Sequence, residues 1–522
     1  TRIKPRWNTL SPGRIFGTGC LTAVRGQCCL PLLTLYPISA YVILLGAEGV
    51  GRAELQIGIA CFLVFLVMAA LMYTRRISAL LALPIMAVVI ASIAGIAPAD
   101  ILKDVINAGA LKLHSAYATT MIGAILAELI NKHGIAKAMV RWVAEFSGDS
   151  PFILGLLMTL VTALLFSSLG GLGAVIMVGT VVLPVMLSLG ISAAVAGGLF
   201  LFGINLGGMF NLANWVLYKD VLAVEQDQIV GFVVPFAGLL TAVLVGFLSI
   251  ELRRLSNLKP ALISMALLSA LFYLLSQKSG LLSAAAVKSG PSQESFLIVA
   301  LVLGLLALNA VYRQMKKQAD LPGFAFLTPA VPLILVLGFQ WDIISAFFVG
   351  ISFGVFATWR KDSVNLLTRA IIEGAQSVIP AVILMMGIGM LLCAVMHKTI
   401  ATAIAPLLAA AVPTHAVPYV IGFTLLAPLA LYRGPLSLWG MGSGLVALMQ
   451  KSTALSGQAI MGMLMSVGQL QGVCDPTNTH NVWIATYLGT DTQVLLRKTM
   501  PYVWVAVVGG LVLSVALGFV KL

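Results

Sequence analysis

Long apolar runs, each close to the length of a membrane span, alternate with short polar connections along most of the 522-residue chain. A helix needs about 20 mainly apolar residues to cross the hydrocarbon core of a bilayer. Thirteen runs meet this pattern, namely 30–46, 56–73, 79–95, 114–131, 192–218, 229–250, 260–276, 295–311, 323–338, 341–358, 377–396, 459–483 and 500–519. The pattern predicts an all-α integral membrane protein with about 13 spans.

Two further apolar segments, 151–189 and 415–450, are interrupted by Gly-rich or Pro-containing turns. Backbone polar groups at membrane depth must be hydrogen-bonded, so a turn is tolerated there only inside protein or beside a water-filled cavity. We interpret each segment as a re-entrant helical hairpin that enters and leaves the membrane on one side. An amphipathic stretch precedes the third helix of each half, at 97–113 and at 361–376.

The second half of the chain repeats the pattern of the first half, in the same order and at a nearly constant offset. The matched stretches are Val105–Ala110 with Ala370–Ala375, Gly134–Ala136 with Thr399–Ala401, Ser167–Gly171 with Tyr432–Leu436, and Asn211–Trp215 with Asn478–Trp483. Five crossings per repeat and two linker spans leave the second repeat inverted relative to the first. The predicted organisation is a basic tail (1–29), an extra span (30–52), a first inverted repeat (53–255), a linker with two spans (256–320) and a second inverted repeat (321–522).

Composition and charge agree with a membrane location. Hydrophobic residues make up 60% of the chain and charged residues 9%, whereas soluble domains have about 25% charged residues. A net charge of +13 could indicate nucleic-acid binding, but Lys and Arg also accumulate in cytoplasmic loops. The inverted-repeat topology places 21 Lys and Arg on the N-terminal side and 9 on the other, or 16 and 9 without the tail. This distribution predicts a bacterial inner-membrane protein with a cytoplasmic N-terminus, surrounded by lipid and without a nucleic-acid partner.

Each half contains two predicted breaks in a helix at membrane depth, so there are four in all. They are Ser167–Gly173, Asn205–Asn214, Leu431–Ser437 and Cys474–Asn481. Helix N-termini that face a cavity attract anions, and carbonyl groups freed by a break coordinate cations. We therefore expect a substrate and ion site between the four breaks. The six cysteines show no metal-ligand spacing, and no cofactor is predicted beyond a coupling ion, H⁺ or Na⁺.

Arg433 is a cation inside an apolar segment, a placement that costs about 2.5–3.5 kcal/mol on insertion scales. It is interpreted as a clamp on a substrate carboxylate. The alternatives are a shallow loop position or an ion pair with Asp475.

The densest polar run inside a predicted span is Asp475–Asn481. Pro476 breaks the helix there, and the Thr and Asn side chains offer neutral oxygens and amides suited to hydroxyls, carboxylates or Na⁺. Asp475 and His480 could relay a proton. The alternative is that the span ends near Val473 and the polar run is an ordinary loop.

This layout resembles the ion transporter superfamily, which includes citrate, gluconate and dicarboxylate carriers, over about residues 50–520. The resemblance implies a homodimer in which a transport domain moves by an elevator motion, with substrate and ions at the hairpin tips and helix breaks. The substrate-binding residues it implicates are Ser167, Ser168, Gly170, Asn211, Asn214, Arg433, Gly434, Ser437, Thr477, Asn478 and Asn481. We also predict Gly171 for substrate binding, and Asp475, Thr479 and His480 for ion coupling. The tips read Ser-Ser-Leu-Gly-Gly and Tyr-Arg-Gly-Pro-Leu rather than the Ser-Asn-Thr of the sodium–dicarboxylate branch. That difference favours the citrate or gluconate branch and proton coupling.

The sequence thus favours a secondary active transporter that imports a small organic anion, such as citrate, gluconate or a dicarboxylate, coupled to H⁺ or Na⁺. A cation/proton antiporter of the same fold is the main alternative, although it would need an acidic pair deep in the core. An enzyme is not predicted, because the chain has no His-Glu-x-x-His pattern and no paired carboxylates inside its predicted spans. Paired hairpins suit alternating access better than a passive channel.

Overall fold

The computed structural model describes residues 52–74, 76–252, 292–316, 321–434, 436–439 and 442–521. All of them belong to one compact unit, Val50–Leu522. The predicted tail 1–29, the predicted spans 30–46 and 260–276 and the side chain of Arg433 lie outside the described part of the chain. Within that part the regular elements are all helices, and the one β-bridge joins His415 to Lys521.

The helices before the linker are α2 (Arg52–Tyr73), α3 (Ala79–Ile93), α4 (Pro98–Asp100), the π-helix η1 (Ile101–Asn107), α5 (Ala108–Leu111), α6 (His114–Lys132), α7 (Ile135–Ser147), α8 (Pro151–Phe166), α9 (Gly171–Ser188), α10 (Ala193–Met209), α11 (Leu212–Leu222) and α12 (Gln226–Glu251). From the linker onward they are α14 (Gln293–Met315), the 3₁₀-helix η3 (Gly323–Leu327), α15 (Val331–Phe339), α16 (Ile343–Ala357), α17 (Ser363–Met396), α18 (Lys398–Ala411), α19 (Ala416–Leu426), the 3₁₀-helix η4 (Ala427–Arg433), α20 (Gly442–Ser452), α21 (Gly457–Cys474), α22 (Thr479–Tyr487) and α23 (Thr492–Ala516).

Several described helices are long and apolar enough to cross a membrane. Seven qualify individually, and α10 with α11, bent by 55° at their junction, makes an eighth if the pair is one span. Five shorter helical segments, among them α3, α8 and α16, are apolar as well. The protein is therefore a multi-span membrane protein whose described regular elements are all helices, and the exact number of spans stays a prediction.

The order of elements in the first half recurs in the second. α8, α10 and α12 begin at Pro151, Ala193 and Gln226, and their counterparts α19, α21 and α23 begin at Ala416, Gly457 and Thr492. The step along the chain is nearly the same for all three pairs. Both halves thus run through a two-armed apolar segment, an interrupted helix and a long final helix in the same sequence.

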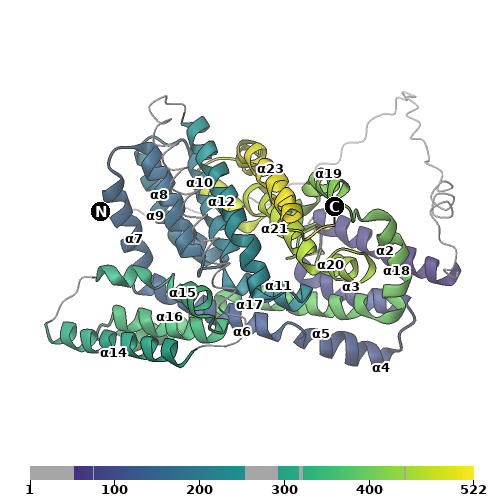
Figure 1. Ribbon diagram of the computed structural model, residues 1–522, viewed down its shortest axis with the longest axis horizontal. Helices are drawn as coiled ribbons and strands as arrows, with labels where there is room; N and C mark the ends of the chain where they lie inside the picture. Colours follow the sequence, from purple (N-terminus) through teal and green to yellow (C-terminus); the bar gives the residue numbers. More distant parts are fainter. Residues whose placement is uncertain are drawn as a thin grey trace, which may run out of the picture. The chain divides into compact units, whose positions relative to one another are not determined.

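The centre of the molecule is formed by the interrupted helices. α10 is apolar around its whole circumference and most of its residues are buried, as expected of a helix enclosed by other helices. It packs on α8, α12 and α23, and α21 packs on α23 (Figure 1). By contrast, few residues of α2 and α14 are buried, and their apolar side chains form the kind of surface that lipid covers in a membrane protein.

The close crossing of α17 with the α5–α6 region is built on glycines. A Cβ on Gly109 would lie 2.5 Å from the Cα of Met390, and one on Gly374 would lie 2.9 Å from the Cα of Ile125. The step along the chain from Gly109 to Gly374 equals the step from Ile125 to Met390. In the predicted repeat, Gly374 is thus the counterpart of Gly109, and Met390 is the counterpart of Ile125. The two glycine contacts are equivalent, with the two halves of the chain exchanged.

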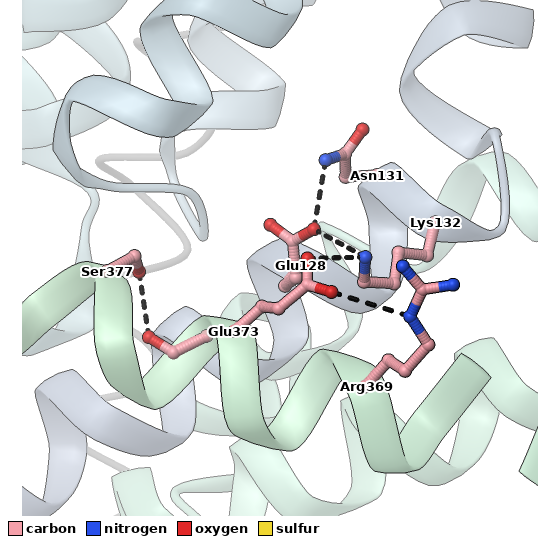
Figure 2. Close-up of polar contacts among 7 residues, drawn as sticks. Glu128, Asn131, Lys132, Arg369, Glu373 and Ser377 are labelled. Carbon is pink, nitrogen blue, oxygen red and sulfur yellow. Dashed lines mark hydrogen bonds and ion pairs between the residues drawn. The ribbon is translucent and has the colours of Figure 1, made fainter. Parts of the chain in front are cut away.

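Polar side chains join the same two helices at the C-terminal end of α6, as Figure 2 shows. Lys132 donates to Glu373 on α17 over 2.6 Å and lies 3.4 Å from Glu128 on its own helix. Arg369 reaches the second oxygen of Glu373 at 3.5 Å, and Asn131 donates to Glu128. The network fixes the register of α6 against the first half of α17.

Two predicted elements differ from the structure. The predicted amphipathic stretch 361–376 and the predicted span 377–396 form one continuous helix, α17, because a change of polarity does not interrupt the backbone and Pro380 is accommodated inside the helix. The predicted span 323–338 is instead the short η3 followed by the nine-residue α15. Prolines at 322, 329 and 332 limit continuous α-helix in this segment.

Candidate substrate and ion site

The first hairpin turns between α8 and α9 at Ser167–Gly170. Ser167 bonds back to the carbonyl of Leu164 (2.7 Å), while the hydroxyl of Ser168 donates to the carbonyl of Pro329 (2.6 Å). Gly171 has φ +81°, in the left-handed region that favours glycine. Gly170 and Gly171 are exposed, with open space where a side chain would stand, and no side chain caps α9. The first amide groups of α9 are therefore accessible, which is the arrangement that attracts an anion.

The break between α10 and α11 is tied to this hairpin by Asn211. Its Oδ1 accepts from the N–H of Ala213 and so caps α11 (3.0 Å). Its Nδ2 donates to the carbonyls of Phe166 (3.2 Å) and Leu169 (3.0 Å) in the hairpin. One buried side chain thus holds both the tip and the helix break. Nearby, Asn214 bonds the carbonyl of Gly208 within the break itself (2.9 Å).

In the second half, Asp475 links the helix break to the hairpin, but it accepts a hydrogen bond from the hairpin backbone where Asn211 donates. It is fully buried at the end of α21. One carboxylate oxygen accepts from the N–H (2.8 Å) and the hydroxyl (2.6 Å) of Thr477, and the other accepts from the N–H of Tyr432 in η4 (2.9 Å). Tyr432 has φ +58°, a left-handed conformation that costs about 1–2 kcal/mol. The hydrogen bond from its N–H to Asp475 stabilises that turn.

Two buried acceptor atoms near the second break have no partner among the described residues. They are Oδ1 of Asn481 and Oε1 of Gln469. Asn481 uses its amide nitrogen on the carbonyl of Val473 (2.9 Å), and Gln469 uses its own on Met465 (3.1 Å). Buried carbonyl oxygens without a donor are costly, so both would be satisfied by a bound hydroxyl or a cation.

The remaining predicted residues of the second half lie around the same break. Asn478 caps α22 through the N–H of His480 (3.4 Å), and Thr479 is the exposed first residue of that helix. Ser437 donates to Oε1 of Gln471 (2.6 Å). Gly434 is enclosed, since a Cβ there would overlap the carbonyl oxygen of Leu429. The predicted clamp role of Arg433 is untested, because the description of that residue stops at its backbone.

The two halves meet at the interrupted helices. A Cβ on Gly472 of α21 would overlap Oδ1 of Asn205 on α10, so the Asn205 amide sits directly on the α21 backbone. Gly179 of α9 likewise lies against the indole of Trp483 on α22. In the other direction, Gln450 at the end of α20 donates to the carbonyl of Leu222 on α11 (2.7 Å). Each hairpin's second arm therefore contacts the broken helix of the opposite half.

Sequence reasoning assigned no role to Asn205, Gln469 or Gln471. Each is a polar side chain in an otherwise apolar helix, and that signal could have identified them. In the part of the chain that the structure describes, no three His, Cys, Asp or Glu side chains are grouped as metal ligands.

Comparison with known proteins finds no matching family model and no matching curated protein. Among solved structures, the YdaH transporter of Alcanivorax borkumensis is 15% identical, with 80% of this chain and 87% of that chain covered at a TM-score of 0.39. MtrF of Neisseria gonorrhoeae, described with a class of antimetabolite efflux pumps, is 13% identical over 91% and 96% of the two chains, also at 0.39. Both scores are below 0.5, so the function has to be inferred from this chain's own residues.

Proposed function

We propose that this protein is a secondary active transporter for a small organic anion, built from two inverted repeats. The main support is that a side chain at a helix break is hydrogen-bonded to a hairpin tip in each half. Asn211 makes these bonds in the first half and Asp475 in the second. Irregular backbone at membrane depth is retained where it lines a cavity or a binding site. The reciprocal contacts of Gly109 and Gly374, each with the other's counterpart, support a two-fold relation between the repeats.

A hydroxy-carboxylate such as citrate or gluconate suits the polar groups at these breaks. Its carboxylate would accept from the uncapped amides at the start of α9. Its hydroxyl would donate to one of the unpartnered oxygens, that of Asn481 or that of Gln469. A dicarboxylate would satisfy the amides alone and would leave these two oxygens to a coupling cation.

The cation/proton antiporter is the less favoured function. Such a protein needs a carboxylate that is free to bind the transported cation. Asp475, the buried acid of the second break, already accepts three hydrogen bonds.

The test is flux in proteoliposomes that contain the purified protein. Labelled citrate, gluconate and succinate are offered under separate Na⁺ and proton gradients, with uptake and release both followed. We expect gradient-driven movement of at least one hydroxy-carboxylate, lost in Asn481→Leu and retained in Asn131→Leu, which alters a polar residue away from the breaks. Na⁺/H⁺ exchange without any carboxylate flux would establish the antiporter instead.

A further inference from the structure

A carboxylate outside the four helix breaks lies where α11 meets α6. Asp220 stands in the last turn of α11, which packs on α6. Its Oδ2 atom is buried and has no hydrogen-bond partner among the described residues. A charged oxygen in such a position has lost its hydration without replacement, which is unfavourable. Adding a proton to this oxygen removes that cost.

The groups that face Asp220 all attract a negative charge. The backbone of Ala116 at the start of α6 and the side chains of His114, Lys219 and Lys112 favour the charged form of the carboxylate. α6 begins at a kink, with φ −109° and ψ 32° at Leu113, so its first amide groups have no partner within the helix. An ionised Asp220 is therefore held at the positive end of α6.

The other titratable groups around α11 are few or engaged elsewhere. Tyr117 of α6 lies within electrostatic range of Asp220, with Cys393 of α17 beside it. α21 contains no charged residue. Lys451 of α20 donates to the carbonyl of Met396, and Asp227 of α12 is exposed.

α11 links this carboxylate to both hairpins. At its first turn Asn211 holds the tip of the α8–α9 hairpin. At its last residue the carbonyl of Leu222 accepts from Gln450 of α20. An 11-residue helix spans about 16 Å, so α11 is a short rigid connection between Asp220 and the proposed transport site.

We propose that Asp220 is a proton-binding site of this protein, and that protonation of its carboxylate releases α11 from the start of α6. The proton comes from water near His114 and Lys112, which are exposed, and adds to Oδ2. The neutral carboxyl is held less strongly at the start of α6 and by Lys112 and Lys219, and α11 moves together with Asn211. The inference rests on the proposed transport function and names its coupling ion as the proton.

The experiment uses the full chain in lipid nanodiscs without substrate. Infrared difference spectra recorded from about pH 4 to about pH 9 report the carbonyl stretch of a protonated carboxyl group. In parallel, a nitroxide pair at Met121→Cys on α6 and Ala223→Cys after α11 reports their separation, in a background without the six native cysteines. Both positions are exposed.

We expect a protonated-carboxyl band and a change of separation that share one midpoint. Asp220→Asn should remove the component of the band that shares its midpoint with the separation, while the exposed acids that titrate near pH 4 remain. It should also hold the separation at its low-pH value at every pH. Asp220→Glu should restore titration with a shifted midpoint, which separates loss of the acid from loss of folding. Asp227→Asn, an exposed acid on the next helix, is the matched control and should behave as the unmodified chain.

The proposal is overturned if the Asp220→Asn protein keeps the whole titrating band of the unmodified chain, or if its separation still follows pH. Because neither measurement requires transport, a titrating Asp220 with no anion flux would overturn the transport function alone. Anion flux driven by Na⁺ with a silent Asp220 would overturn this inference alone.

Discussion

At the scale of single residues, buried polar atoms with a hydrogen-bond partner differ from those without one. The first belong to side chains that stabilise the fold, and the second are available to a ligand. Asp475 is at one extreme, because two backbone amides and one hydroxyl donate to its two oxygens. Asn481 and Gln469 are at the other, each with a buried oxygen that nothing in the described chain contacts through a hydrogen bond. The predicted ion-coupling role of Asp475 is therefore less direct than its role in holding the second hairpin.

Replacing Asp475 by Asn should destabilise the second hairpin. The amide nitrogen would face the N–H of Tyr432 or of Thr477, so two donors would meet and one buried bond would be lost. We expect the free energy of unfolding to fall by about 2–3 kcal/mol. The measurement is the midpoint of thermal unfolding in detergent, which should be lower. Asp491→Asn is the control, because Asp491 is an exposed helix cap and Asn caps equally well. Equal effects of the two changes would contradict the role assigned to Asp475.

His133 should make stability depend on pH. It lies just after α6, and its Nδ1 is bonded to the hydroxyl of Thr358, which itself donates to the carbonyl of Gly354. Burial, and then the nearby Arg360, lower the pKa of His133 to about 4 from an ordinary 6.5. The unfolded chain therefore binds a proton between these values and the folded chain does not. Stability is full above about pH 6.5 and falls as the pH drops towards 4, by at most about 3 kcal/mol.

The measurement is the thermal midpoint in detergent from about pH 7 to about pH 4. His133→Gln should flatten the profile in this window. His415→Gln, which removes an exposed histidine, should leave the profile unchanged. A profile for His133→Gln as steep as that of the unmodified protein would assign the acid sensitivity to another group.

At the scale of elements, the glycine contacts decide how closely helices approach. Gly374→Leu should disrupt the α17–α6 crossing, because its side chain would meet the backbone of Ala124 and Ile125. Because the backbone cannot rotate away as a side chain can, we expect the free energy of unfolding to fall by about 1–3 kcal/mol or more. Thermal unfolding in detergent measures this change. Gly304→Leu is the matched control in α14, where the same position is open. It should be neutral or slightly stabilising, since Leu favours helix more than Gly does.

At the scale of the whole molecule, the inverted repeat predicts opposite membrane sides for corresponding helix starts. Lys137 near the start of α7 should lie on the cytoplasmic side, and Lys398 at the start of α18 on the other side. Both are exposed, so single cysteines there, in a background without the native six, can be labelled with an impermeant maleimide in spheroplasts. Lys398→Cys should react and Lys137→Cys should react only after permeabilisation. Labelling of both from one side would exclude inverted repeats.

The sequence by itself determined the apolar helices, because membrane-length hydrophobicity is a local signal. The recurring order of elements agrees with the predicted repeat, and the inverted arrangement of the two halves stays a prediction. The sequence also located the breaks, with Asn211 and Asp475 among the residues marked for function. It misjudged 361–396 as two elements, since a polar face on a helix gives the same local signal as a connection between helices.

Only the tertiary structure decided which residues meet. Asn211 and Asp475 hold hairpin tips, Asn205 rests on Gly472, and α11, which carries Asp220, packs on α6. All of these contacts join segments that are distant in the chain. Sequence patterns cannot predict these contacts, because an Asn, Asp or Gly has the same place in the pattern whether its partner is water, backbone or another helix. The physical reason is the cost of burying a polar atom without a partner: each such atom is either paired across the fold or left for a ligand, and the fold alone fixes which.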